Sequence, residues 1–231
     1  EQAPSLAFDA TAGLSLGEFT ALAAADALGF EDGLRVVRRR GKVMQHACEA
    51  STGGMAAIVG LDEEAVRDVC GQAGVSLANL NCPGQIVISG DADKMEAACA
   101  AAKAAGAKRA IPLPVAGAYH SPLMQPAQAG LAGALAKVEL REPSVPVYSN
   151  VTGQAHAAAG TIAATMVDQV TSPVKWEACI RAMIADGITR FIELGPGKAL
   201  SGFMRRIDRD IEMLNVADCE SLAKATESLN A

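Results

Sequence analysis

The hydrophobic and polar positions of the chain follow two different rhythms, and the more regular one runs from residue 53 to residue 115. Short apolar runs typical of buried strands alternate there with helical patterns. The predicted strands are 55–61, 75–80, 85–89 and 108–115, and the predicted helices are 62–73 and 91–105. Asn81-Cys82-Pro83-Gly84 supplies a turn between the two middle strands. The order β-α-β-β-α-β predicts a ferredoxin-like unit.

The sequence on both sides of this unit returns to single strands separated by helices. Strands are predicted at 10–14, 145–149, 189–194 and 211–216, with helices from residue 18 and at 31–50, 123–138, 161–170, 174–185, 198–207 and 221–229. This alternation is typical of an α/β fold with a mostly parallel, three-layer sheet. We therefore expect a large subdomain, residues 1–52 and 118–231, that carries residues 53–117 as an inserted small subdomain.

The helix at 31–50 carries three consecutive arginines. Its apolar positions Leu34, Val37, Gly41, Met44 and Cys48 follow a three-four spacing and predict the buried face. At 100° per residue Arg39 points away from that face, while Arg38 and Arg40 flank it about equally. Periodicity thus excludes Arg39 and leaves the other two open.

A Gly-x-Ser-x-Gly motif, Gly13 to Gly17, joins the first predicted strand to the first helix. A serine on such a tight strand-to-helix turn holds its hydroxyl clear of the backbone, and the N–H of the next residue can face an oxyanion. Glycines on either side are expected to allow the strand and the helix to pass close together. Ser15 is therefore the candidate nucleophile, and the Leu16 N–H is a candidate oxyanion donor.

A serine nucleophile needs a base, and the chain has three histidines. His46 belongs to the arginine-bearing helix, and His156 lies in a polar stretch rich in glycine and alanine. His120 follows the end of a predicted strand, in a loop, where catalytic side chains are often found. We expect His120 to be the base.

Composition excludes several other classes of protein. The net charge is −6 and only 3% of the residues are aromatic, which argues against a nucleic-acid surface. No apolar run is long enough for a membrane span, and the first residues do not resemble a signal peptide. The six cysteines are widely spaced and suggest neither a disulfide framework nor a metal site. We expect a soluble protein of the cytoplasm.

Several motifs together resemble a known family, the malonyl-CoA:acyl-carrier-protein transacylases of bacterial and plastid fatty-acid synthesis. They are Gly13-Leu14-Ser15-Leu16-Gly17-Glu18-Phe19, Arg40-Gly41-Lys42, Met44-Gln45, Asn81-Cys82-Pro83-Gly84-Gln85, Gly117-Ala118-Tyr119-His120, Gln169, Ser172-Pro173-Val174-Lys175-Trp176 and Glu193-Leu194-Gly195-Pro196-Gly197-Lys198. The resemblance covers essentially the whole chain. It implies an α/β-hydrolase-like large subdomain with a ferredoxin-like small one.

The resemblance also implies a role for each site residue. Ser15 would be the nucleophile and His120 its base, with the main-chain carbonyl of Gln169 orienting the histidine. Arg40, rather than Arg38, would bind the malonyl carboxylate, and the Leu16 N–H would be one oxyanion donor. The implied reaction moves malonyl from malonyl-CoA to the thiol of acyl carrier protein through a malonyl-serine, with no metal and no bound cofactor.

Two departures from the family pattern are visible. Many members have histidine where this chain has Leu14. The family's N-terminal strand and Gly-Gln-Gly-Ser-Gln loop, which donates a second oxyanion hydrogen bond, have no counterpart in these 231 residues. We therefore expect these residues alone to be poorly soluble or weakly active. The alternatives are an acyltransferase domain of a polyketide synthase, a serine esterase, and a non-catalytic fragment.

Overall fold

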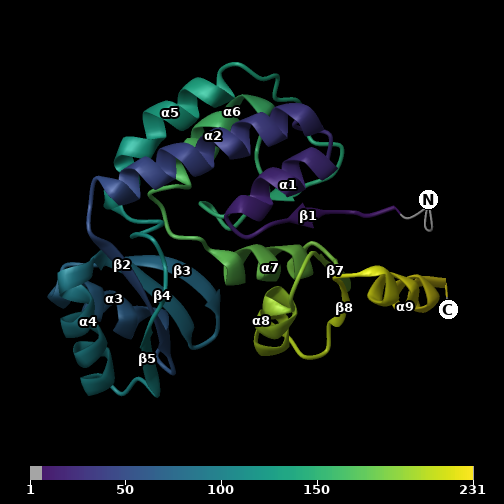
Figure 1. Ribbon diagram of the computed structural model, residues 1–231. Coiled ribbons are helices and arrows are strands. Elements are labelled where there is room, and N and C mark those ends of the chain that lie inside the picture. Colours follow the sequence, from purple (N-terminus) through teal and green to yellow (C-terminus); the bar gives the residue numbers. More distant parts are fainter. Residues whose placement is uncertain (1–6, 231) are drawn as a thin grey trace.

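The computed structural model describes residues 7–230, in which short strands and longer helices alternate along the chain (Figure 1). Residues 1–6 of the predicted first segment lie outside the described part. That segment contains β1 (Thr11–Ala12), α1 (Leu16–Ala24) and α2 (Phe30–Glu49). Each helix predicted from the hydrophobic pattern of this segment is present.

The next segment forms a four-stranded antiparallel sheet with two helices. Its elements are β2 (Gly53–Val59), α3 (Glu63–Ala73), β3 (Ser76–Cys82), β4 (Gln85–Asp91), α4 (Ala92–Ala104) and β5 (Arg109–Pro112). The strands pair in the order β3-β4-β2-β5. Asp62 caps α3 by accepting a hydrogen bond from the Ala65 N–H at 2.9 Å, and Gly74 ends that helix in the left-handed conformation. The order of strands and helices is the one that the sequence predicts.

The two faces of this sheet have different partners because side chains alternate along a strand. Ile58, Ile86 and Ile88 form a buried cluster with residues of α3 and α4. Met55 and Val87 lie in another buried cluster, against which Tyr119 of a later loop packs. The second face is thus turned toward the rest of the chain.

A layer of helices makes up the opposite part of the molecule, where α1, α2, α5 and α6 lie together (Figure 1). The short 3-10 helix η1 (Pro122–Met124) leads into α5 (Gln125–Leu135), and α6 is Ala159–Asp168. Their apolar faces share one core, in which Leu22, Leu131 and Ile162 are at most 1% exposed. Burial of this many large apolar side chains is the main stabilising contribution of the layer.

The remaining strands form two separate parallel pairs rather than one sheet. β1 pairs with β6 (Val147–Tyr148), and β7 (Arg190–Leu194) pairs with β8 (Glu212–Val216). Among residues 7–230 no strand hydrogen bonds join the two pairs. Outside the antiparallel unit the strands thus pair in parallel, as predicted, but among the described residues they form two pairs and not the one continuous sheet that was expected. The first strand is also shorter than predicted, since the turn toward Ser15 begins at Gly13.

Three helices accompany these strands: α7 (Trp176–Ala185), α8 (Ala199–Ile207) and α9 (Cys219–Asn230). α8 follows a turn in which Gly195 and Gly197 have positive φ angles. The Glu193 side chain accepts hydrogen bonds from the Leu200 and Ser201 N–H groups, at 3.1 and 2.9 Å. A carboxylate thus already occupies the N-terminus of α8.

Every helix described is too short or too polar to cross a membrane.

One segment ties the antiparallel sheet to the rest of the molecule. Val174, just before α7, donates to the Ala78 carbonyl and accepts from the Leu80 N–H, both at 2.8 Å. These bonds add a short parallel bridge to the edge strand β3. The chain between α6 and α7 is thereby held at the β3 edge of the sheet.

Candidate active site

Ser15 stands at the sharp turn between β1 and α1, with φ 53° and ψ −98°. We call this turn, residues 13–17, the elbow. A positive φ is unfavourable for a residue with a side chain, so the surrounding structure must hold this conformation. A Cβ on Gly13 would lie 1.9 Å from the Gly17 carbonyl carbon, which explains glycine at that position. A Cβ on Gly17 would meet nothing within 4 Å. The close approach therefore requires only the first of the two glycines.

His120 reaches Ser15 from the loop that follows β5. The imidazole is buried, and its Nε2 lies 2.8 Å from the Ser15 Oγ. Its Nδ1 lies 2.9 Å from the main-chain carbonyl oxygen of Gln169. A carbonyl can only accept, so Nδ1 carries the proton and Nε2 presents its lone pair to the serine hydroxyl. This is the tautomer that a general base requires.

The environment keeps this imidazole neutral. Burial lowers the pKa of His120 to about 4; the hydrogen bond to the Gln169 carbonyl raises that pKa and the Arg40 charge lowers it. Because this value lies well below neutral pH, the base is unprotonated at pH 7. His120 itself has φ 58°, so the base and the nucleophile both have positive φ angles.

The arginine that reaches the site is Arg40, and it lies in the middle of the buried face of α2. That face carries Val36, Arg40, Met44 and Ala47. The face predicted from sequence is displaced from it, since Leu34 is 53% exposed and Gly41 is also exposed. Charged side chains are seldom buried, so the hydrophobic pattern of the helix does not mark Arg40 as a core position, and this explains the displacement. On the observed face Arg40 is buried, whereas Arg38 and Arg39 are exposed.

Arg40 donates from Nη2 to two acceptors, the Ser15 Oγ at 2.8 Å and the Gln169 Oε1 at 3.1 Å. Its guanidinium also stacks over the Phe19 ring, 5.6 Å from the ring centre. Burial lowers the pKa of Arg40 to about 10, although the charge of Glu18 acts in the opposite direction. The group therefore remains a cation at neutral pH. Its Nε is buried and has no partner among the described residues.

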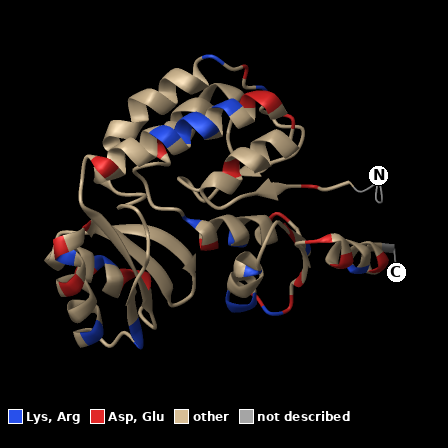
Figure 2. Ribbon diagram, in the orientation of Figure 1, with Lys and Arg blue, Asp and Glu red and all other residues tan. Residues whose placement is uncertain are grey.

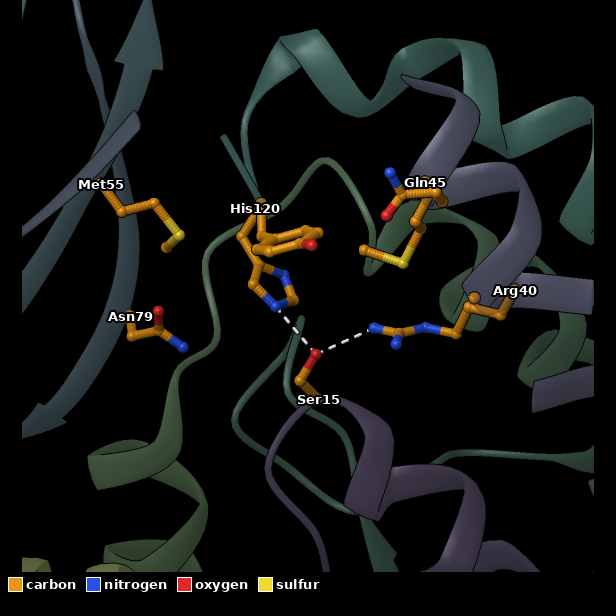
Figure 3. Close-up of a pocket in the computed structure, with 9 residues that line it drawn as sticks. Ser15, Arg40, Gln45, Met55, Asn79 and His120 are labelled. Carbon is orange, nitrogen blue, oxygen red and sulfur yellow. Dashed lines mark hydrogen bonds between the residues drawn. The ribbon is translucent and has the colours of Figure 1, made fainter. Parts of the chain in front are cut away.

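These side chains line a cavity of about 360 Å³ (Figure 3). Its walls are Ser15, Arg40, Gly41, Met44, Gln45, Met55, Asn79, Tyr119 and His120. Met55 and Asn79 come from the antiparallel sheet, and the other residues come from α2, the elbow and the loop after β5. The site thus lies between the sheet and the helical layer, and it offers a nucleophile, a neutral base and a buried cation within one pocket.

Comparisons with known proteins agree with this arrangement. The family model described as "Acyl transferase domain" matches residues 3–226. The chain belongs to the acyl transferase domain family. It is 46% identical over 226 residues to a malonyl CoA-acyl carrier protein transacylase of Bacillus subtilis, covering 96% of this chain and 71% of that protein.

Solved structures of other family members superpose closely on this acyl transferase domain. An acyl-carrier-protein S-malonyltransferase from Burkholderia pseudomallei matches with a TM-score of 0.94 and 42% identity, over 98% of this chain and 75% of that one. A malonyl-transacylase in complex with a type II PKS acyl-carrier protein matches with a TM-score of 0.94 and 38% identity, over the same shares of the two chains. At these identities the α/β fold, with its parallel and antiparallel sheets, is shared.

Four of the five residues singled out from the sequence of this acyl transferase domain meet at one point. Ser15, His120, Arg40 and Gln169 are joined by hydrogen bonds. The fifth, Leu16, begins α1, and its N–H has no acceptor among the described residues. This is the usual state of an N–H in the first turn of a helix, and it leaves the donor available. The other candidate bases lie elsewhere: His46 is exposed on α2, and the His156 side chain is buried beneath the elbow.

A buried polar cluster beneath the elbow was not predicted from the sequence. Its centre is Glu18, which the pattern explains only as an acid in the first turn of a helix. Asn150, two residues after β6, accepts from the Ser15 N–H at 2.6 Å and donates to the Gly13 carbonyl at 2.8 Å. His156 lies 3.0 Å from Glu18. The only signal in the sequence was polar residues beside predicted strands, which is weak.

The described residues contain no cluster of side chains that could hold a metal.

Proposed function

We propose that this protein transfers malonyl from malonyl-CoA to the phosphopantetheine thiol of acyl carrier protein, in type II fatty-acid synthesis. The observation that carries the proposal is the meeting of His120 and Arg40 on the same Ser15 hydroxyl oxygen. A neutral imidazole beside a serine supports acyl transfer. A buried cation beside that serine favours an acyl group that ends in a carboxylate. The relatives named for malonyl transfer support the same substrate.

In the first half of the proposed reaction, Ser15 attacks the thioester carbonyl carbon while His120 Nε2 takes the hydroxyl proton. The Leu16 N–H stabilises the oxyanion that forms. When the carbon–sulfur bond breaks, His120 returns the proton to the leaving coenzyme A thiolate, and malonyl remains as an ester on Ser15. The Gln169 carbonyl holds Nδ1 and so keeps Nε2 directed at the hydroxyl throughout.

The second half reverses the roles. The carrier thiol attacks the ester carbonyl, His120 takes the thiol proton, and the Ser15 oxygen leaves and regains a proton from His120. Arg40 would bind the malonyl carboxylate in both halves. Its Nη1 makes no hydrogen bond within the described residues and can donate to that carboxylate, whereas Nη2 is held by Ser15 and Gln169. No step in this sequence uses a metal or a bound cofactor.

The same proposal includes a division of the chain. Residues 53–117 would be the ferredoxin-like small subdomain, inserted into an α/β-hydrolase-like large subdomain of residues 1–52 and 118–231. The β3-β4-β2-β5 strand order supports the first assignment, and the elbow with its parallel neighbour β6 supports the second. Because coenzyme A thioesters and carrier protein are the substrates, the cytoplasm is the proposed compartment.

The carboxylate role of Arg40 is tested by comparing malonyl-CoA with acetyl-CoA. Arg40→Ala should raise the transition-state free energy of malonyl transfer by about 2–5 kcal/mol, the usual cost of removing one partner of a buried charge pair. This increase is measured as a fall in kcat/KM for malonyl-CoA. Acetyl transfer should change little, since that acyl group has no carboxylate. Arg38→Ala, an exposed neighbour on the same helix, is the matched control. Equal losses in the two variants would contradict the assignment.

A second candidate function is the loading of a polyketide synthase carrier, which the similar transacylase in complex with a type II PKS acyl-carrier protein favours. The acyl chemistry would be the same, and only the acceptor would differ. Transfer rates to a fatty-acid carrier and to a type II PKS carrier, measured with one preparation of malonyl-enzyme, separate the two. A serine esterase would instead release free malonate with no thiol acceptor present.

A further inference from the structure

A buried carboxylate lies directly beneath the nucleophile, and the proposed reaction does not use it. Glu18 is 0% exposed and sits in the first turn of α1, three residues after Ser15. Its Oε2 accepts from the Asn150 N–H at 3.2 Å and from the Gln169 Nε2 at 2.7 Å. Its Oε1 lies 3.0 Å from the His156 Nε2. A buried charge is costly unless it is fully hydrogen-bonded, and these partners meet that requirement.

Gln169 connects this carboxylate to the pocket arginine. Its side-chain Nε2 donates to Glu18, and its Oε1 accepts from the Arg40 Nη2. Nε2 also donates to the Ser15 carbonyl at 3.0 Å, and the Gln169 side chain is buried. One residue thus contacts Glu18, Arg40 and the elbow through its side chain, while its own main-chain carbonyl holds His120.

The two ends of a carboxamide are chemically different, and this fixes the sense of the Gln169 side chain. Arginine can only donate hydrogen bonds, and a carboxylate can only accept them. The amide therefore satisfies both neighbours only with its oxygen toward Arg40 and its nitrogen toward Glu18. In the reversed sense an N–H group would face the Arg40 Nη2, and both contacts would be lost.

We propose that Glu18 is a positioning residue for the substrate carboxylate: through the Gln169 carboxamide it fixes Arg40 in the orientation that binds the malonyl group. This inference rests on the proposed function. Glu18 touches no reacting atom. It orients the amide, the amide oxygen holds Nη2, and Nη1 makes no hydrogen bond among the described residues, which leaves it for the substrate carboxylate. The Glu18 charge also favours the charged form of Arg40 across the amide.

Two substitutions test this chain of contacts. Glu18→Gln keeps the size of the side chain but replaces the charged acceptor of the Gln169 Nε2 with a neutral amide, which weakens the hydrogen bond that holds Gln169. Gln169→Met keeps the main-chain carbonyl that holds His120 and removes the amide. For each variant kcat and KM are measured with malonyl-CoA and with acetyl-CoA, with an acyl carrier protein as acceptor.

We expect both variants to lower the malonyl-to-acetyl ratio of kcat/KM by about tenfold, the worth of one hydrogen bond to a charged group. The loss should fall mainly on the KM for malonyl-CoA, because binding of the carboxylate is what weakens. His156→Gln is the matched control. It alters the other side of Glu18, can donate to the same oxygen, and should keep the ratio unchanged.

The wild-type ratio is measured first. If the wild-type protein does not prefer malonyl-CoA, the proposed function is wrong. If it does, and both variants keep that preference or lose both activities equally, Glu18 and Gln169 are structural and the inference is overturned. If Gln169→Met loses the preference and Glu18→Gln keeps it, Gln169 positions Arg40 without Glu18, and the role of Glu18 is overturned. Loss of the preference in both variants, with the ratio kept in His156→Gln, supports the inference.

Discussion

The two residues that meet at the reacting oxygen both have unfavourable backbone conformations. Ser15 and His120 have φ angles of 53° and 58°. Such conformations cost about 1–3 kcal/mol each and persist only where neighbouring contacts impose them. Asn150 holds the Ser15 N–H, and the Gln169 carbonyl holds the His120 ring. The strain is consistent with a site that is formed before substrate arrives.

The acylation rate should depend on pH through His120. A base acts only when it is unprotonated, and burial lowers the pKa of this imidazole to about 4. The rate of malonyl-enzyme formation should therefore be flat near neutral pH and fall as the pH decreases through about 4. Rapid-quench measurements of kcat/KM between acidic and neutral pH test this. A midpoint near the ordinary histidine value would contradict the buried, neutral state of the base.

Removal of the base should slow the same step. His120→Ala is expected to reduce acylation by roughly 10²- to 10⁴-fold, the usual contribution of a positioned general base. His46→Ala is the control, because that histidine is exposed on α2 and lies outside the pocket. Single-turnover rates with malonyl-CoA compare the two variants. A larger loss in His46→Ala would move the base to that residue.

At the scale of elements, the elbow gives a sharp comparison between two glycines. Gly13→Ala would place a methyl group 1.9 Å from the Gly17 backbone, so either β1 or α1 must shift. Such overpacking should cost about 1–3 kcal/mol of unfolding free energy or more. Gly17→Ala meets nothing within 4 Å and lies in α1, where alanine favours the helix by up to about 1 kcal/mol.

Urea unfolding of the two glycine variants measures this difference. We expect a lower midpoint for Gly13→Ala and an unchanged or higher one for Gly17→Ala. Similar destabilisation in both would mean that the motif needs both glycines for steric reasons, as its symmetric spacing in the sequence suggests.

The elements themselves were largely predictable from sequence. The antiparallel sheet and its helices lie within a few residues of the predicted bounds, because period-two and period-3.6 patterns alternate there without ambiguity. The helix α2 is the exception in detail. Its hydrophobic positions pointed to a face through Leu34 and Gly41, but the buried face carries Arg40. A pattern of hydrophobicity cannot reveal a charged residue that is buried for its chemistry.

The cluster beneath the elbow could not be predicted for a different reason. Glu18 meets Asn150, His156 and Gln169 across more than 130 residues of sequence. Such contacts depend on how α1, α6 and the segment after β6 come together, which local patterns do not encode. The pairing of β1 with β6 and of β7 with β8 could not be predicted either. A short apolar run indicates a strand but does not reveal which other strand it pairs with.

At the scale of the whole molecule, the pocket lies where the antiparallel sheet meets the helical layer. Figure 2 shows Lys and Arg along the middle of α2, which forms one wall of the pocket, and around α8, while α3 and α4 carry residues of both charges. The Val174 bridge joins the two parts beside Gln169. The geometry of the site therefore depends on this junction remaining closed.

Hydrogen exchange tests the rigidity of the junction. The Leu80 and Val174 amides donate across it at 2.8 Å, and Val174 is fully buried. We expect these two amides to be protected as strongly as the Ile58 and Ile86 amides within the sheet. Exchange at the rate of exposed loop amides, with the sheet amides still protected, would mean that the two parts separate readily.

The most direct test of the acyl-enzyme mechanism is the intact mass of the protein after incubation with malonyl-CoA. The wild-type protein should gain one malonyl group, which transfer to acyl carrier protein then removes. Ser15→Ala should gain none, while Ser51→Ala, which changes a serine on the loop after α2, should gain the group as the wild type does. A malonyl adduct of normal stoichiometry in Ser15→Ala would contradict the assignment of the nucleophile, and with it the role of the whole site.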